Sequence, residues 1–120
     1  MILAALALQA AALPQPSPEF TPPSEYTIHG MGNAPCSMWT TTGSDAPAFK
    51  SWVAGVITGH NAVLGQLYGM TNLLAGSDLD QAMNWITAYC RRNPTRPVHY
   101  ATLELVAELI SRQRPAPSPR

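Results

Sequence analysis

The feature that most constrains the fold is the pair Cys36 and Cys90, the only cysteines among 120 residues. In an exported protein of this size, two cysteines most simply form one disulfide, and this bond would close 54 residues of sequence. We therefore predict a Cys36–Cys90 crosslink that ties together nearly everything that folds. Two buried free thiols in a cytosolic protein are the alternative, so the prediction depends on whether the chain is exported.

An export signal is indicated by residues 1–12, MILAALALQAAA, which are uncharged and almost wholly apolar. Ala10 and Ala12 fit the small-x-small cleavage pattern, which predicts a signal peptide over residues 1–12 and a mature start near Leu13. The usual Lys or Arg is missing ahead of the run. A core helix is the alternative, but the prolines that follow would isolate it. Since a membrane span needs about 20 apolar residues, we expect a periplasmic or secreted protein with no span in the mature chain.

Proline-rich stretches mark the borders of the folded part. Residues 13–25 contain PQPSPEFTPPS, and residues 115–120 read PAPSPR. Both are predicted to be extended, disordered linkers or tails. One helical domain over residues 26–114 remains, with room for one core and no sign of an internal repeat.

The first long helix is predicted over residues 46–60, or as far as Leu67, because apolar residues recur three and four apart from Phe49 onward. Asp45 is the expected cap and Pro47 the first-turn proline.

Glycines inside this helix need a reason, because each costs about 1 kcal/mol relative to Ala. Gly55 and Gly59, four residues apart, are expected on one face where another helix approaches closely. Gly65, Gly69 and Gly76 are expected to loosen the connection that follows.

A second helix is predicted from Ser77, as its cap, to Arg92, where Asn93-Pro94 stops it. Cys90 would lie in its last turn. Its predicted apolar stripe consists of Ala82, Trp85, Ile86 and Tyr89.

The last helix is predicted over residues 97–113, with Glu104 and Glu108 on the solvent side and Arg112 four residues beyond Glu108. Its expected buried face consists of Tyr100, Leu103, Val106, Ala107 and Ile110. A short helix should begin at Cys36. Since residues 26–29 are the only candidate strand, the fold class is all-α, a small bundle of about four helices stapled by one disulfide.

The charge balance argues against nucleic acid as a partner. Seven basic and seven acidic side chains give a net charge of zero, and only Arg91, Arg92 and Arg96 lie close together. The charged fraction of 12% is low. A surface with so few charges is poorly protected against association, so a protein partner or a homodimer is expected.

No catalytic, cofactor or metal site emerges from the sequence. A disulfide would remove the thiolate that a cysteine nucleophile needs. His29, His60 and His99 share no metal-ligand spacing, and His60 on an apolar face is best explained as a hydrogen-bonded core residue. Gly30-Met31-Gly32 lacks the strand and third glycine of a dinucleotide loop, so it is interpreted as a turn. The chain is therefore predicted not to be an enzyme.

Two segments carry a resemblance. The helix FKSWVAGVITG and the ending WITAYCRRNP, with its cysteine, look like parts of small bacterial periplasmic helical proteins. The chain resembles the HdeA-like acid-stress chaperones and the Rap/Tai-type immunity proteins that neutralise type VI secretion amidases. The resemblance implies a few helices stapled by one disulfide between Cys36 and Cys90, and nothing catalytic.

These families imply different functions. An acid chaperone exposes apolar surface when carboxylates are protonated, and this chain has few carboxylates. The leading hypothesis is therefore an exported periplasmic protein-binding module, of the immunity or inhibitor kind that acts against a cell-wall hydrolase. The alternatives are an accessory subunit of an envelope complex or an acid-stress chaperone. Candidate partner-contact residues in the glycine-rich connection are Gln66, Tyr68 and Asn72.

Overall fold

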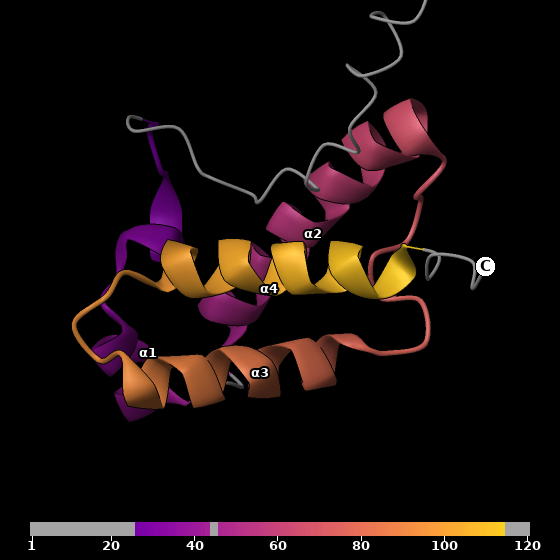
Figure 1. Ribbon diagram of the computed structural model, residues 1–120. Helices are drawn as coiled ribbons and strands as arrows, with labels where there is room; N and C mark the ends of the chain where they lie inside the picture. The colour runs from indigo at the N-terminus through magenta and orange to yellow at the C-terminus, as the bar shows by residue number, and fades with distance from the viewer. Residues whose placement is uncertain (1–25, 44–45, 115–120) are drawn as a thin grey trace, which may run out of the picture.

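The computed structural model describes residues 26–43 and 46–114, and this part of the chain is a bundle of helices (Figure 1). A 3-10 helix, η3 (Gly30–Asn33), precedes four α-helices. These are α1 (Cys36–Thr42), α2 (Pro47–Tyr68), α3 (Leu79–Arg92) and α4 (Val98–Gln113). Within the described residues there is no strand, only an isolated bridge between Pro35 and Pro97. The predicted all-α bundle of four helices is confirmed. The predicted signal peptide and both proline-rich tails lie outside the described residues.

The predicted disulfide is present. Cys36 begins α1 and Cys90 lies in the last turn of α3, both fully buried, with their Cα atoms 4.8 Å apart. Backbone hydrogen bonds strengthen the same junction, because the amide of Cys36 donates to the carbonyl of Arg96 at 2.7 Å. The amide of Val98 donates to the carbonyl of Ala34 at 2.8 Å. The N-terminal segment is thereby fastened to the turn between α3 and α4.

Trp39 anchors α1 in the core. Its side chain is fully buried, and its ring lies 4.9 Å from that of Phe49 in α2. The indole Nε1 donates a hydrogen bond to the hydroxyl of Thr87 in α3 at 2.8 Å. A buried tryptophan is favourable only when its N–H is paired, so this bond lets one ring join three helices.

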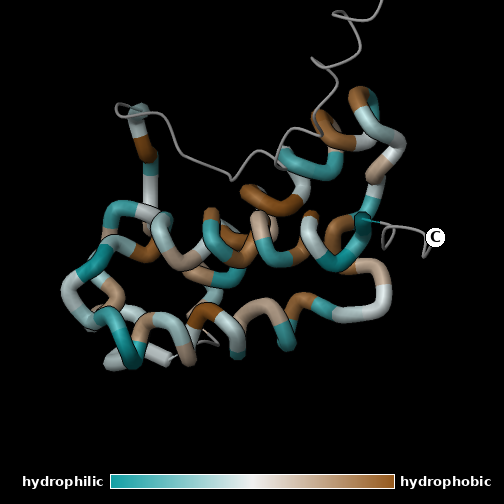
Figure 2. The backbone as a smooth tube through the Cα atoms, viewed as in Figure 1, coloured by the Kyte–Doolittle hydropathy of each residue, from teal (hydrophilic) through white to brown (hydrophobic). Residues whose placement is uncertain are grey.

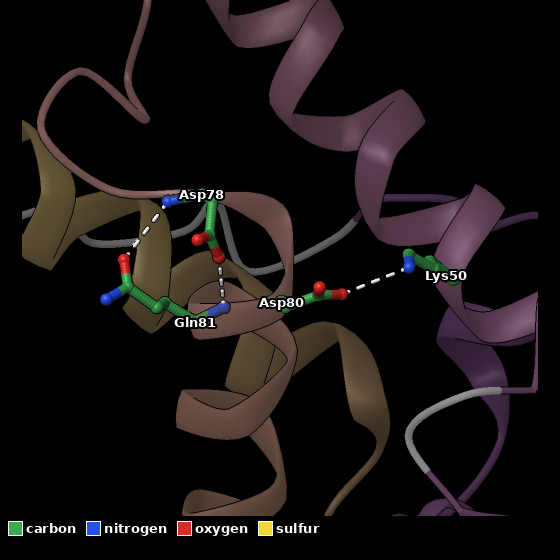
Figure 3. Close-up of polar contacts among 4 residues, drawn as sticks. All are labelled: Lys50, Asp78, Asp80 and Gln81. Carbon is green, nitrogen blue, oxygen red and sulfur yellow. Dashed lines mark hydrogen bonds and ion pairs between the residues drawn. The ribbon is translucent and has the colours of Figure 1, made fainter.

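The start of α3 corrects the predicted cap. The N-cap residue is Asp78, and not Ser77. The Asp78 carboxylate accepts the Gln81 amide at 2.8 Å, and the Gln81 side chain accepts the Asp78 amide at 3.1 Å (Figure 3). This reciprocal pair needs a glutamine three residues after the cap, and Gln81 satisfies that spacing only for Asp78. The end of α3 at Arg92 is as predicted.

The apolar stripe of α3 is confirmed in part. Ala82, Ile86 and Tyr89 are buried, but Trp85 is only half-buried. Met83, which the periodicity did not single out, is buried.

The buried face of α4 differs from the predicted one. Of the five expected residues only Val106 is buried, whereas Tyr100 is 43% exposed. The helix instead buries Val98, Ala101, Thr102, Leu105, Val106 and Leu109. Apolar residues occupy more than the buried side of α4, and Leu103, outside that side, is half-buried and lines the groove. The predicted pairing of Arg112 with Glu108 is present at 3.2 Å.

The predicted close helix contact at Gly55 and Gly59 is wrong within this chain. Both glycines are exposed, and a Cβ added to either would meet nothing within 4 Å. The reason is the course of α2, whose C-terminal part rises away from α3 and α4 (Figure 1). The helix begins at Pro47 with no side-chain cap at Ala46, and Asp45 lies outside the described residues. It ends at Tyr68, and the C-cap Gly69 has a φ of 71° that suits glycine. Gly65, which was expected to loosen the connection, lies inside the helix instead.

The segment before α1 is extended over residues 26–29 and pairs with no strand of the described chain. Gly30-Met31-Gly32 forms the turn of η3, as predicted.

Candidate functional site

An apolar groove of about 560 Å³ lies between α2, α4 and the extended N-terminal segment. Helix α2 supplies one wall, with Trp52, Val56, Val63 and Leu64. Helix α4 supplies Leu103 and His99, and the N-terminal segment supplies Tyr26 and Ile28 at the rim. The groove lies where α2 and α4 diverge (Figure 1).

The apolar surface continues beyond the groove along the C-terminal part of α2, which carries Val63, Leu67 and Tyr68 and is called the projecting part of α2 below. Val63 is 57% exposed, Leu67 65% and Tyr68 73%. Figure 2 shows hydrophobic residues recurring along this part of the helix up to its end. No Asp, Glu, Lys or Arg occurs in residues 51–77. An exposed apolar face of this kind, on a helix segment without charged residues, is unusual on a monomeric soluble protein.

Polar groups that face the groove are paired with one another or with the backbone. The Tyr26 hydroxyl lies 3.0 Å from Nδ1 of His99, and their rings meet edge to face with centroids 5.5 Å apart. Burial lowers the pKa of His99. The pKa of Tyr26 is raised, first by burial and then by the nearby Tyr100 hydroxyl.

His60 lies in α2 and bonds its own helix, with Nδ1 2.8 Å from the carbonyl of Val56. The predicted hydrogen-bonded role of His60 is thereby confirmed, although the residue is half-buried at the groove rather than in the core. The indole Nε1 of Trp52 donates to the carbonyl of His29 at 2.8 Å. With these polar groups occupied, the groove presents mainly hydrocarbon to a ligand.

The side chains that line the groove are mostly apolar, and they are accompanied by two histidines and one tyrosine. Cys36 and Cys90 are joined in the disulfide, so neither offers a thiolate. Among the residues that the structure describes, no three His, Cys, Asp or Glu side chains gather as a metal site. No helix in the same part of the chain is long and apolar enough to cross a membrane.

Comparison with protein families, curated proteins and solved structures finds no match to this chain.

The three predicted contact residues lie in different surroundings. Gln66 and Tyr68 are exposed on the last turn of α2, beside Leu67. Asn72 is engaged in the loop that follows, because its side chain accepts the amide of Leu74 at 3.1 Å and its carbonyl accepts the Gln113 side chain at 2.7 Å. That these residues contact a partner remains a prediction.

Sequence reasoning missed the groove itself. Val56, Val63 and Leu103 fit the helical periodicity of their segments. That periodicity shows which side of a helix is apolar, but it does not show whether another element covers that side. The one available signal in the sequence was the absence of charged residues over residues 51–77.

The cluster of Arg91, Arg92 and Arg96 lies away from the groove. Arg96 is held by the Tyr89 hydroxyl, to which its Nη1 donates at 2.8 Å. Arg91 and Arg92 close the last turn of α3, where positive charge is favourable.

Proposed function

We propose that the protein is an exported, non-enzymatic protein-binding module whose binding face combines the groove with the exposed part of α2. The observation that carries this proposal is the run of exposed Val63, Leu67 and Tyr68 beside an apolar groove. When a partner covers these side chains, apolar surface is removed from water, and this stabilises the complex by about 25 cal/mol per Å² of buried area. We call this surface the α2 face below.

A protein partner is favoured over a small molecule because the groove is open. Sites for small ligands enclose most of the ligand surface, typically ~70–90%. Here Val63 and the glycines on the α2 wall are exposed to solvent, and the apolar surface extends past the groove to Tyr68. A helix or a loop of a partner protein matches such a shape better.

A rigid binder is favoured over an acid-stress chaperone. In a chaperone of this kind, acid opens the fold because protonation of carboxylates removes substantial stability. The ion pairs Lys50–Asp80 (Figure 3) and Arg112–Glu108 are exposed on both sides, and such pairs contribute about 0–1 kcal/mol. The disulfide supports both the rigidity and an oxidising compartment. Within this class we propose an inhibitor or immunity protein of a cell-wall hydrolase first, and an accessory subunit second.

Site-specific photo-crosslinking in the producing cell tests the proposal. A benzophenone amino acid at Tyr68 should give adducts with a protein, whereas the same group at Arg91, exposed on α3, should give none. A single hydrolase in the adduct supports the inhibitor, and a set of envelope proteins supports the subunit. No adduct at Tyr68 or Leu67, in protein that is folded and oxidised, would contradict the binding face.

A further inference from the structure

We propose that the α2 face pairs with the α2 face of a second copy of this chain, in an antiparallel arrangement about a two-fold axis. The projecting part of α2 in each copy would enter the groove of the other. This inference rests on the proposed function, since it names one partner of the proposed binding face.

The face is complementary to itself in shape. Val63 and Leu67 project from α2 with more than half of each side chain exposed. Gly55 and Gly59 leave open space above the helix, where an added Cβ would meet nothing within 4 Å. Two protrusions and two gaps therefore occur on one helix, all within or beside the groove.

The spacing of these residues allows all four contacts at once. Gly59 and Val63 each lie two residues from position 61, and Gly55 and Leu67 each lie six residues from it. In a two-fold antiparallel pair, residues at equal distance on either side of the axis face each other. An axis at position 61 places Val63 of each copy over Gly59 of the other, and Leu67 over Gly55.

The crossing geometry agrees with this register. The four residues are spaced four apart, so they follow a single i±4 row of α2. Packing of such rows against each other gives a crossing angle of about −50°. An inclined crossing lets the two helices touch near position 61 while their ends separate, which leaves room for α4 and Tyr26 at the edge of each groove.

Charge does not oppose the pairing. A two-fold axis would bring a charged residue on one α2 helix close to the same residue on the other. Residues 51–77 contain no Asp, Glu, Lys or Arg. Lys50, just before this stretch, pairs with Asp80 at 3.1 Å (Figure 3), and Asp78, just after it, caps α3. An aliphatic, uncharged helix is the occupant that the groove fits, and the chain carries such a helix itself.

Sedimentation of the exported, oxidised chain tests the inference. We expect a concentration-dependent dimer, and Val63→Asp and Leu67→Asp should each raise the dissociation constant at least ~10-fold, a change of about 1.4 kcal/mol. Gly59→Leu should do the same, because it fills the gap that receives Val63. Thr58→Asp is the matched control, since Thr58 is exposed on α2 but does not line the groove, and it should leave the dimer intact. Circular dichroism and the retained disulfide show that each variant is folded.

A charge-exchange experiment tests the register. Gly59→Glu and Val63→Lys should each dissociate the dimer, and the double variant Gly59→Glu/Val63→Lys should associate again, because opposite charges then face each other across the axis. A monomer at every concentration, or a dimer that is insensitive to Val63→Asp, would overturn the inference. If that monomer still gives adducts with a different protein at Tyr68, only the self-pairing fails and the proposed function stands. Adducts of twice the chain mass support the self-pairing and the use of the α2 face for protein binding.

Discussion

The indole ring of Trp52 packs directly on Gly32, so closely that a Cβ added to Gly32 would lie 2.6 Å from Cε2 and Cη2 of that ring. Gly32 is buried in η3, and the Trp52 Nε1 bond to the His29 carbonyl holds the same junction at 2.8 Å. This contact fixes the N-terminal segment against α2. It therefore also sets where Ile28 and Tyr26 form the rim of the groove.

Substitution of Gly32 should change both stability and the groove. Gly32→Ala forces Trp52 to move, and overpacking of this kind costs about 1–3 kcal/mol. We expect a lower free energy of unfolding in urea, a shift in tryptophan fluorescence and weaker binding at the α2 face. An unchanged fluorescence spectrum together with unchanged stability would contradict the contact.

The opposite result is expected at Gly55. No atom lies within 4 Å of an added Cβ there, so Gly55→Ala should keep the packing and gain up to ~1 kcal/mol from helix propensity. The gain is measured by urea unfolding at concentrations where the chain is monomeric. A loss of stability would mean that Gly55 is covered within the chain, as the sequence had suggested.

Removal of the disulfide should cost much of the stability of the domain. A bond that closes 54 residues contributes about 4 kcal/mol in the loop-entropy model, against about 5–15 kcal/mol for a whole domain. The double variant Cys36→Ala/Cys90→Ala should therefore unfold at much lower urea concentration than the oxidised protein. Reduced wild-type protein is the control and should resemble the variant. Equal stability of the oxidised and reduced forms would show that the bond adds nothing.

Substitution can show whether Asp78 or Ser77 caps α3. Asp78→Ala removes the acceptor for the Gln81 amide and should cost about 1 kcal/mol. Ser77→Ala removes only a side-chain bond to Gln81 and should cost less. Thermal unfolding of the two variants compares them directly, and a larger loss for Ser77→Ala would restore Ser77 as the cap.

Local signals explain why much of the fold could be predicted. The end of α3 follows from Asn93-Pro94, because proline restricts the residue before it. The disulfide follows from a count of two cysteines in a chain interpreted as exported. The start of α2 follows from Pro47, because proline is favoured in the first turn of a helix. Each of these depends on residues that are neighbours in sequence or on a single possible pairing.

The packing of helices against one another explains what could not be predicted. Helix α4 has apolar residues on more than one side, and periodicity alone cannot show that Leu105 packs inward while Leu103 faces the groove. Thr102 is fully buried although it is polar, because its hydroxyl donates to the carbonyl of Val98 at 3.1 Å. Gly55 and Gly59 were expected beneath a neighbouring helix, and only the divergence of α2 from α4 leaves them open.

The pH dependence of stability should be set in part by His99. Burial lowers its pKa in the folded protein below the ordinary value of 6.5. The groups that face it are the Tyr26 hydroxyl at Nδ1 and the ring of Tyr100, stacked at 4.8 Å, and His60 lines the same groove. Above about pH 6.5 both folded and unfolded chains hold His99 neutral. As the pH falls below that value the unfolded chain takes up a proton first, so the free energy of unfolding decreases until the pH has passed through the lowered pKa of the folded state.

Replacement of His99 should therefore flatten this dependence. Urea unfolding at about pH 7.5 and about pH 5 should show a smaller loss of stability for His99→Gln than for the wild-type chain. His29→Gln, at an exposed histidine, is the control and should keep the wild-type dependence. If His99→Gln loses as much stability on acidification as the wild type, the buried imidazole is not its source. If it loses less, the proton that destabilises the fold binds at His99, which lines the groove.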